Sequence, residues 1–206
     1  MFHVEQSALS ASQISALLTP YLPEVPDGIA TQLAVYLDLL LRWNARTNLT
    51  AIREPEEIVR RHFGESLFCG LHVGRQTETL LDLGSGAGFP GLPTALLRPE
   101  IAVTLAESQN KKATFLREAV RTLQLGDVEV WAGRAEALPE TRRFDTVTLR
   151  AVDNMAVALV AAVPRAAREI LVLGSTVPGF PSDFALQPPI PIPGGQASFL
   201  FRAVRG

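Results

Sequence analysis

One segment, residues 79–92 with the sequence TLLDLGSGAGFPGL, constrains the fold of this chain more than any other. Leucines surround Asp82 as in a buried strand, and four glycines then precede an apolar segment with helical spacing. Glycine is needed where a backbone turns with positive φ or approaches a ligand closely. The free N–H groups of such a turn lie at a helix start, where they can hold polar groups of a cofactor. The segment therefore predicts a strand, a nucleotide-binding type of turn and a helix.

The glycine spacing alone does not decide which cofactor the turn binds. The last three glycines fit the dinucleotide pattern G-x-G-x-x-G, and Glu107 follows at about the distance of a ribose-binding acid. Two features favour S-adenosylmethionine instead: the glycine pattern begins earlier, at Gly84, and Asp82 stands at the strand end. A carboxylate there would repel a pyrophosphate but attract a cationic methionine group. An NAD-binding oxidoreductase, a cofactor-sensing module and a turn without ligand are the alternatives.

The segments that follow extend a pattern of alternating strands and helices. We predict strands at residues 101–107, 127–131 and 144–150, and a helix at residues 110–123 capped by Ser108. Glu107 ends the second strand, where its carboxylate can accept hydrogen bonds from both ribose hydroxyls.

Two further positions lie where ligands bind in such sheets, beyond the carboxyl ends of the strands. Ala135 and Glu136 follow the third strand and are placed to meet an adenine edge. Arg150 ends the fourth strand, where it could orient either a substrate base or the methionine carboxylate. The sequence does not decide between these two roles of Arg150.

The chain divides into two portions, a helical one at residues 1–75 and a Rossmann-like core at residues 76–206. Helical spacing of apolar residues predicts helices at residues 7–18, 29–43 and 55–67. The alternation after residue 79 predicts a mostly parallel sheet covered on both faces, an α/β fold. Near the C-terminus we expect an extended loop at residues 188–195 and a last, antiparallel strand at residues 197–204.

Several motifs together resemble one protein family. LLRWNARTNLTAI, IVRRHFGESL, LLDLGSGAGFPGLP, VTLAESQNKKATFLREA, GRAEALP and FDTVTLRAV are similar to the successive motifs of the RsmG (GidB) family. The resemblance runs over residues 40–152, more than half of the chain, and the WNxxxNLTAI and RHxxxSL segments are its most specific parts. It implies a class I S-adenosylmethionine-dependent methyltransferase that methylates N7 of a guanine in 16S rRNA of the small ribosomal subunit.

The resemblance also implies site residues. Gly84 and Phe89 match loop positions that bind S-adenosylmethionine in that family, Ala135 and Glu136 match its adenine-contacting pair, and Arg150 matches its arginine after strand four. Residue pattern and resemblance together predict a cofactor site formed by Asp82, Gly84, Ser85, Gly86, Gly88, Phe89, Glu107, Ala135, Glu136 and Arg150, with Arg150 also as the catalytic residue.

The chain departs from the family pattern at two places. Glu65 stands where the family usually has aspartate in RHxxDSL. The lysine-glycine pair expected after strand five is replaced within ILVLGST, around Leu173 and Gly174. If that lysine ordinarily contacts RNA or the loop near the cofactor, we expect altered substrate affinity or altered activity in this chain.

Composition narrows the class of protein. A chain of 206 residues that is 47% hydrophobic can bury a single substantial core and leaves no room for the second domain of a typical dehydrogenase. Cys69 is the only cysteine, and His3, His62 and His72 have no metal-ligand spacing, so we expect no metal site and a structural role for each histidine. No apolar run reaches the ~18 residues of a membrane span, and residues 1–19 lack a secretory pattern, which predicts a cytoplasmic protein.

Net charge gives little sign of nucleic-acid binding, because 19 basic and 21 acidic residues leave a charge of -2. The best basic cluster contains Arg42, Arg46, Arg53, Arg60 and Arg61, but acidic residues interrupt it and it is also typical of a solvated helix face. The partner, 16S rRNA, therefore follows from the resemblance, with Arg42, Arg46, Arg60 and Arg61 as its expected contacts. A methyltransferase for another RNA or for a small molecule is the alternative.

The expected chemistry needs no general base, since guanine N7 carries an in-plane lone pair and no proton. The work of the enzyme is then to align the methyl donor with N7. In an A-form helix N7 faces a deep, narrow groove, so the guanine must lie in a loop or be turned out.

Overall fold

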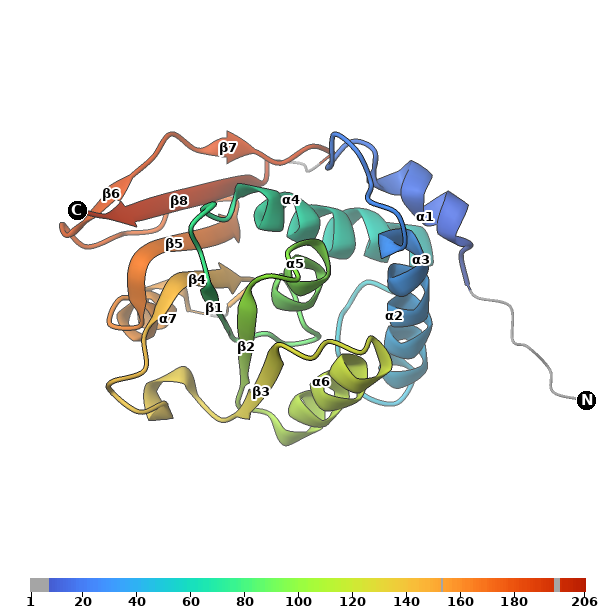
Figure 1. Ribbon diagram of the computed structural model, residues 1–206, viewed down its shortest axis with the longest axis horizontal. Helices are drawn as coiled ribbons and strands as arrows, with labels where there is room; N and C mark the ends of the chain where they lie inside the picture. Colours follow the sequence, from blue (N-terminus) through green and yellow to red (C-terminus); the bar gives the residue numbers. More distant parts are fainter. Residues whose placement is uncertain (1–7, 153, 195–196) are drawn as a thin grey trace, which may run out of the picture.

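The computed structural model describes residues 8–152, 154–194 and 197–206. Within these residues the strands form one eight-stranded sheet in the order β3-β2-β1-β4-β5-β8-β6, with β7 paired to β8 (Figure 1). The strands are β1 (Thr79–Leu83), β2 (Ala102–Glu107), β3 (Val128–Ala132), β4 (Phe144–Arg150), β5 (Ala166–Gly174), β6 (Phe184–Leu186), β7 (Ile190–Pro191) and β8 (Phe199–Arg205). β1 to β5 are parallel, and β8 runs antiparallel to β5. The predicted mostly parallel α/β sheet and its antiparallel last strand are confirmed.

The helices are α1 (Ala11–Leu18), α2 (Ile29–Asn44), α3 (Pro55–Glu57), the π-helix η1 (Ile58–Gly64), α4 (Glu65–His72), α5 (Gly91–Leu97), α6 (Asn110–Thr122), the 3-10 helix η2 (Ala135–Ala137) and α7 (Met155–Ala162). The helix predicted at residues 55–67 thus forms one continuous run of three segments whose middle is a π-helix. A π-helix widens the turn, is rare and occurs frequently at functional sites.

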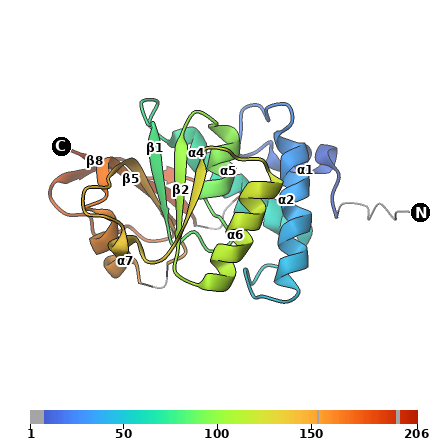
Figure 2. The ribbon, with the colours of Figure 1, turned by 60° about the horizontal axis from the view of Figure 1, so that its bottom comes forward.

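Two separate apolar clusters cover the two faces of the sheet, as predicted. Leu80 and Leu81 are adjacent in β1 and fall in different clusters, because successive side chains of a strand point to opposite faces. The first cluster is formed in part by residues of α1, α2, α5 and α6, whereas the second includes residues of α7. Figure 2 shows α7 on one side of the strands and α2, α5 and α6 on the other. The N-terminal helices therefore pack directly on one face of the sheet.

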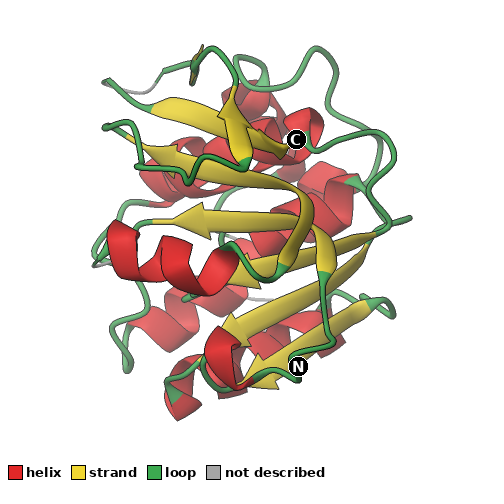
Figure 3. Cartoon of the chain, turned by 90° about the vertical axis from the view of Figure 1, so that its left-hand side faces the viewer, coloured by secondary structure: helices red, strands yellow, loops and turns green. Residues whose placement is uncertain are grey.

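The order of the strands reverses at β1. β2 and β3 continue the sheet on one side of β1, and β4 and β5 continue it on the other. Figure 3 shows the strands side by side in one sheet, with helices in front of it and behind it. In open α/β sheets, ligands bind beyond the carboxyl ends of the strands at such a reversal. The loops that follow β1 and β4 are consequently the expected walls of a binding site.

Some local predictions were wrong. Ser108 does not cap α6, since its N-cap residue is Gln109 and no side chain caps the helix; the backbone N–H of Gln109 instead donates to Glu107 Oε1. β7 interrupts the loop expected at residues 188–195, and β6 was not predicted. Ser7, Gly195 and His3 lie outside the described residues. Among the described helices, none is long and apolar enough to cross a membrane.

Candidate functional site

A cavity of about 480 Å³ opens at the carboxyl ends of β1 and β4, where the strand order reverses. Six of the predicted cofactor residues line it: Gly84, Ser85, Gly86, Phe89, Glu107 and Arg150. Residues of the N-terminal portion complete the wall, among them Thr50, Arg61 and His62. The volume lies in the range of small-molecule sites, about 300–1,000 Å³.

The glycine loop has two kinds of requirement for glycine. Gly86 has a φ of +57°, and a Cβ there would meet nothing closer than Gly84 O at 3.9 Å, so its backbone angle and not its packing requires glycine. Gly88 has a φ of +94° and is buried, and a Cβ there would lie 2.6 Å from the hydroxyl oxygen of Tyr36. Gly88 therefore lets α2 approach the loop from below, while Gly86 faces the cavity. The Tyr36 hydroxyl also donates to Ala87 O.

Asp82 lies beneath the loop and not among the residues that line the cavity. Its side chain is fully buried, and it accepts hydrogen bonds from Gly91 N and Thr148 Oγ1, each at 3.0 Å. Burial raises the pKa of Asp82 to about 6, and the hydrogen bonds oppose that rise. Asp82 thus fixes the start of α5 beneath the loop, and its direct contact with a cationic ligand stays a prediction.

Glu107 lies at the cavity and holds the loop as well. Its Oε2 accepts from Gly86 N at 2.9 Å, and its Oε1 accepts from Gln109 N at 2.7 Å. Each carboxylate oxygen can accept more than one hydrogen bond. Glu107 is therefore still able to accept ribose hydroxyls from a ligand in the cavity.

Arg150 is held by side chains and backbone of the helix run that contains η1. Its Nη2 donates to Arg61 O at 2.6 Å and to Glu65 Oε2 at 2.7 Å, and Nη1 lies 3.2 Å from His62 Nδ1. The Glu65 and Arg150 side chains are 8% and 11% exposed, so this ion pair is screened little by solvent. Arg150 is consequently fixed in one orientation at the cavity wall. Glu65, noted from the sequence only as a departure, is the residue that neutralises it.

His62 contacts the loop through its ring, which stacks on Phe89 at a centroid distance of 4.7 Å and an interplanar angle of 21°. Burial, followed by the charges of Arg150 and Arg61, lowers the pKa of His62 to about 3. The ring is therefore neutral near pH 7. From the sequence we expected only a structural role for His62 and assigned none to Thr50; the motifs RHxxxSL and NLTAI were the available signal.

Besides Asp82, three predicted residues do not line this cavity. Gly88 is buried against Tyr36, and Ala135 and Glu136 lie in η2, which follows β3. Ala135 is buried in the second apolar cluster, and Glu136 is exposed. The buried Arg165 holds this segment by donating to backbone oxygens that include Glu136 O at 3.3 Å and Leu138 O at 2.7 Å.

The predicted basic cluster is divided by the fold. Arg60 pairs with Glu56 at 3.0 Å and Glu57 at 3.5 Å, whereas Arg61 lines the cavity. Arg42 and Arg46 line a separate hollow of about 680 Å³ beside Trp43 and Glu118. Arg53 donates to Asn44 O and Asn48 Oδ1.

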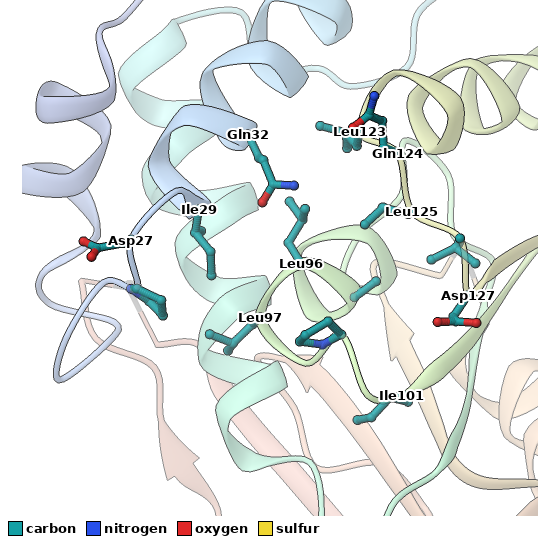
Figure 4. A pocket seen from close by; sticks show the side chains of 15 residues that line it. Asp27, Ile29, Gln32, Leu96, Leu97, Ile101, Leu123, Gln124, Leu125 and Asp127 are labelled. Atoms are coloured by element: carbon teal, nitrogen blue, oxygen red, sulfur yellow. The ribbon is translucent and has the colours of Figure 1, made fainter.

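Another cavity, of about 520 Å³, lies at the opposite ends of the strands (Figure 4). Its walls come from the link before α2, the end of α5 and the turn between α6 and β3, and its polar side chains include Asp27, Gln32, Gln124 and Asp127. None of the predicted site residues lines it. No group of three His, Cys, Asp or Glu residues that could hold a metal ion occurs in the part of the chain that the structure describes.

Comparison with known proteins gives matches in sequence and in fold. Residues 29–174 match the family model GidB, described as rRNA small subunit methyltransferase G. Ribosomal RNA small subunit methyltransferase G of Xanthomonas euvesicatoria pv. vesicatoria (strain 85-10) is 49% identical over 129 residues. That match covers 63% of this chain and 60% of the relative, so the chain spans less than two thirds of its length.

Solved structures show the fold. A proposed O-methyltransferase from Klebsiella pneumoniae is 17% identical, with a TM-score of 0.63 over 95% of this chain and 99% of that chain. A mutant of MtNAS in complex with S-adenosylmethionine is 14% identical, with a TM-score of 0.58 over 97% of this chain and 85% of that chain. The predicted class I methyltransferase fold is confirmed.

Proposed function

This chain belongs to the GidB family, whose model is that of rRNA small subunit methyltransferase G and matches well over half of its residues, and on that premise we propose its activity. It transfers the methyl group of S-adenosylmethionine to N7 of a guanine in 16S rRNA of the small ribosomal subunit. We place this activity in the cytoplasm.

One observation carries the proposal: the cavity at the reversal of strand order brings the glycine loop, Glu107 and Arg150 together. All three lie within the residues that match the family. The same cavity is lined by Thr50, which lies in the WNxxxNLTAI segment, and by Arg61 and His62, which lie in the RHxxxSL segment. A cofactor loop and family-specific polar residues thus face one space.

The residues at the cavity fit S-adenosylmethionine. The Gly86 backbone faces open space on the side where a Cβ would stand, which leaves room for close approach of a ligand. We assign the ribose hydroxyls to Glu107, and the remaining polar groups to the loop at Gly84, Ser85 and Gly86 beside Phe89. Gly88 and Asp82 support the loop from beneath, and Ala135 and Glu136 stay as proposed adenine contacts. When bound, S-adenosylmethionine supplies a methyl group on a positively charged sulfur.

The side chains at the cavity suit a reaction that needs alignment and no proton transfer. His62 has both ring nitrogens engaged, by Arg150 and Thr50, and its low pKa keeps it neutral. It is therefore not placed to take a proton from a substrate, and guanine N7 has none to give. Arg150, fixed by Glu65, orients the guanine. Holding two reactants in line can contribute on the order of 7 kcal/mol to a reaction of this kind.

Cofactor binding and methyl transfer test the proposal separately. Calorimetry should show binding of S-adenosylhomocysteine and none of NAD. Incubation with small-subunit particles and radiolabelled S-adenosylmethionine should then give N7-methylguanine in 16S rRNA, mapped to one position. Binding of S-adenosylhomocysteine without label in the particle, but with label in another RNA or a small molecule, would replace the proposed substrate.

We propose RNA contacts for Arg61, Arg42 and Arg46, and a weaker one for Arg60, because Glu56 and Glu57 neutralise it. Each lost phosphate contact reduces the salt dependence of binding by about one unit of slope. Arg61→Ala should raise KM for the particle and flatten its salt dependence, and the matched variant Arg60→Ala should change both much less. Equal effects of the two variants would contradict the division of the cluster.

A further inference from the structure

Thr50 lines the cavity from the wall formed by the N-terminal portion, and its hydroxyl has unusually restricted hydrogen-bonding options. We propose that the Thr50 hydroxyl is held as an obligate hydrogen-bond donor and that it recognises O6 of the target guanine. This inference rests on the proposed function, whose substrate it specifies further: it assigns the group that distinguishes guanine from adenine at the methylated edge.

The first step is the fixed direction of Arg150. Its Nη2 is engaged by Arg61 O and Glu65 Oε2, which leaves Nη1 directed at His62 Nδ1 at 3.2 Å. A guanidinium can only donate hydrogen bonds. Nδ1 of His62 must therefore be the acceptor in this contact and carries no hydrogen.

The second step follows from the state of the ring. A neutral imidazole with an unprotonated Nδ1 carries its hydrogen on Nε2. Nε2 lies 2.7 Å from Thr50 Oγ1, so His62 donates and Thr50 accepts. The stacking of His62 on Phe89 and its burial keep the ring in this orientation.

The third step shows that the second lone pair of Thr50 Oγ1 is also occupied. The backbone N–H of Ile52 also donates to Thr50 Oγ1, at 3.2 Å. A hydroxyl has two lone pairs and one hydrogen, so two donors fill its acceptor capacity. Only the O–H remains for a ligand, and it can only donate.

The backbone of Thr50 is fixed as well. The buried side chain of Asn44 accepts from Leu49 N at 2.8 Å and Thr50 N at 3.0 Å, and it donates to Thr50 O at 3.0 Å. The hydroxyl therefore has both a fixed position and a fixed polarity. Such preorganised groups discriminate best, because a mismatched partner leaves them unpaired.

The two purines differ at the group this donor would meet. Guanine presents N7 and O6 as neighbouring acceptors, whereas adenine presents N7 as an acceptor and an N6 amino group as a donor. Alignment of N7 for methylation brings the group on C6 to one adjacent position. An O–H group fixed at that position can donate a hydrogen bond to O6 of guanine. The N6 amino group of adenine is itself a donor, so the two groups could not pair.

The test compares Thr50→Val, which keeps the branched shape without the hydroxyl, with Thr50→Ser, which keeps the hydroxyl. We expect Thr50→Val to bind S-adenosylhomocysteine with a Kd within about twofold of wild type and to lose about tenfold or more in kcat/KM for the small-subunit particle, the value of one hydrogen bond to a charged or buried partner. Thr50→Ser should recover most of that loss. A wild-type kcat/KM for Thr50→Val would overturn this inference alone, and so would a loss of cofactor affinity that matches the loss of kcat/KM.

A second substrate separates recognition of O6 from a structural role. Particles reconstituted with 2-aminopurine at the mapped guanine retain N7 but lack O6. Wild type should lose activity on this substrate, while Thr50→Val should be nearly indifferent to the replacement. Additive losses would assign Thr50 a merely structural role and overturn the inference. A wild-type protein that methylates no guanine in the particle would overturn the proposed function first.

Discussion

The burial of Asp82 beneath the glycine loop predicts how the free energy of unfolding changes with pH. Asp82 has a pKa near 6 in the folded protein, against 3.8 for the free group, because it is fully buried. Because the folded protein binds this proton more tightly, Asp82 contributes to the free energy of unfolding. That contribution is fully present below pH 3.8, the pKa of the group in the unfolded chain, and is lost as pH rises through 6. The shift of roughly two units corresponds to about 3 kcal/mol of unfolding free energy.

Asp82→Asn removes this titration and keeps the shape, since the amide can accept from Gly91 N and donate to Thr148 Oγ1. The unfolding free energy of wild type minus that of Asp82→Asn should therefore fall by about 3 kcal/mol between pH 3.5 and 7. Urea denaturation followed by tryptophan fluorescence measures both proteins across the series, and taking their difference cancels groups that titrate alike.

A control with the opposite sign is available at Asp145. Burial favours a higher pKa for Asp145, but hydrogen bonds from Glu78 N and Thr79 N and the charge of Arg168 lower it overall. Wild type should therefore gain stability relative to Asp145→Asn as pH rises through the acid range. A wild-type advantage over Asp82→Asn that is constant with pH, or that grows with pH, would refute the reasoning about the buried carboxylate.

Three further variants test the supports of the cavity. Tyr36→Phe leaves Ala87 O without its buried donor and should cost about 1–3 kcal/mol in urea denaturation while weakening S-adenosylhomocysteine binding; an unchanged unfolding midpoint would contradict it. Glu107→Gln should weaken cofactor binding by roughly 1.5–3 kcal/mol in calorimetry, and an unchanged Kd would leave Glu107 only its role in holding the loop. Glu65→Gln leaves Arg150 buried without a countercharge and should lower the unfolding free energy by about 3 kcal/mol, whereas Glu65→Asp should cost less; equal losses would mean that chain length matters more than charge.

The sequence was most informative where a single segment determines its own geometry. The apolar strand β1 and the glycine loop were predicted because positive φ and strand alternation are local properties. The support that Asp82 gives to the start of α5 was not predicted, although the same alternation contains it. Asp82 lies two residues after Leu80 and so points to the same face of the sheet, toward the start of α5, and not out of the strand end.

The sequence pattern did not predict which distant segments contact one another. Glu65 and Arg150 are 85 residues apart, and although each was noted separately, nothing in the sequence indicated that they form a pair. Their meeting depends on η1, a π-helix that the helical period of 3.6 residues does not reveal. The same turn separates Arg60, which faces Glu56 and Glu57, from its neighbour Arg61 at the cavity.

The charges around the cavity also explain why Glu65 matters for the ligand. An unneutralised arginine in a low-dielectric wall would repel the positive sulfur of S-adenosylmethionine. Because Glu65 pairs with Arg150 at 2.7 Å, the two together present little net charge to the cavity. S-adenosylhomocysteine has a neutral sulfur, so loss of the Glu65 charge should affect the two ligands differently. In Glu65→Gln, the affinity for S-adenosylmethionine should fall by on the order of 1 kcal/mol more than that for S-adenosylhomocysteine, about fivefold in the ratio of Kd values. An unchanged ratio of Kd values, measured by calorimetry on a folded variant, would show that the ion pair stabilises the fold but does not affect how the positive sulfur binds.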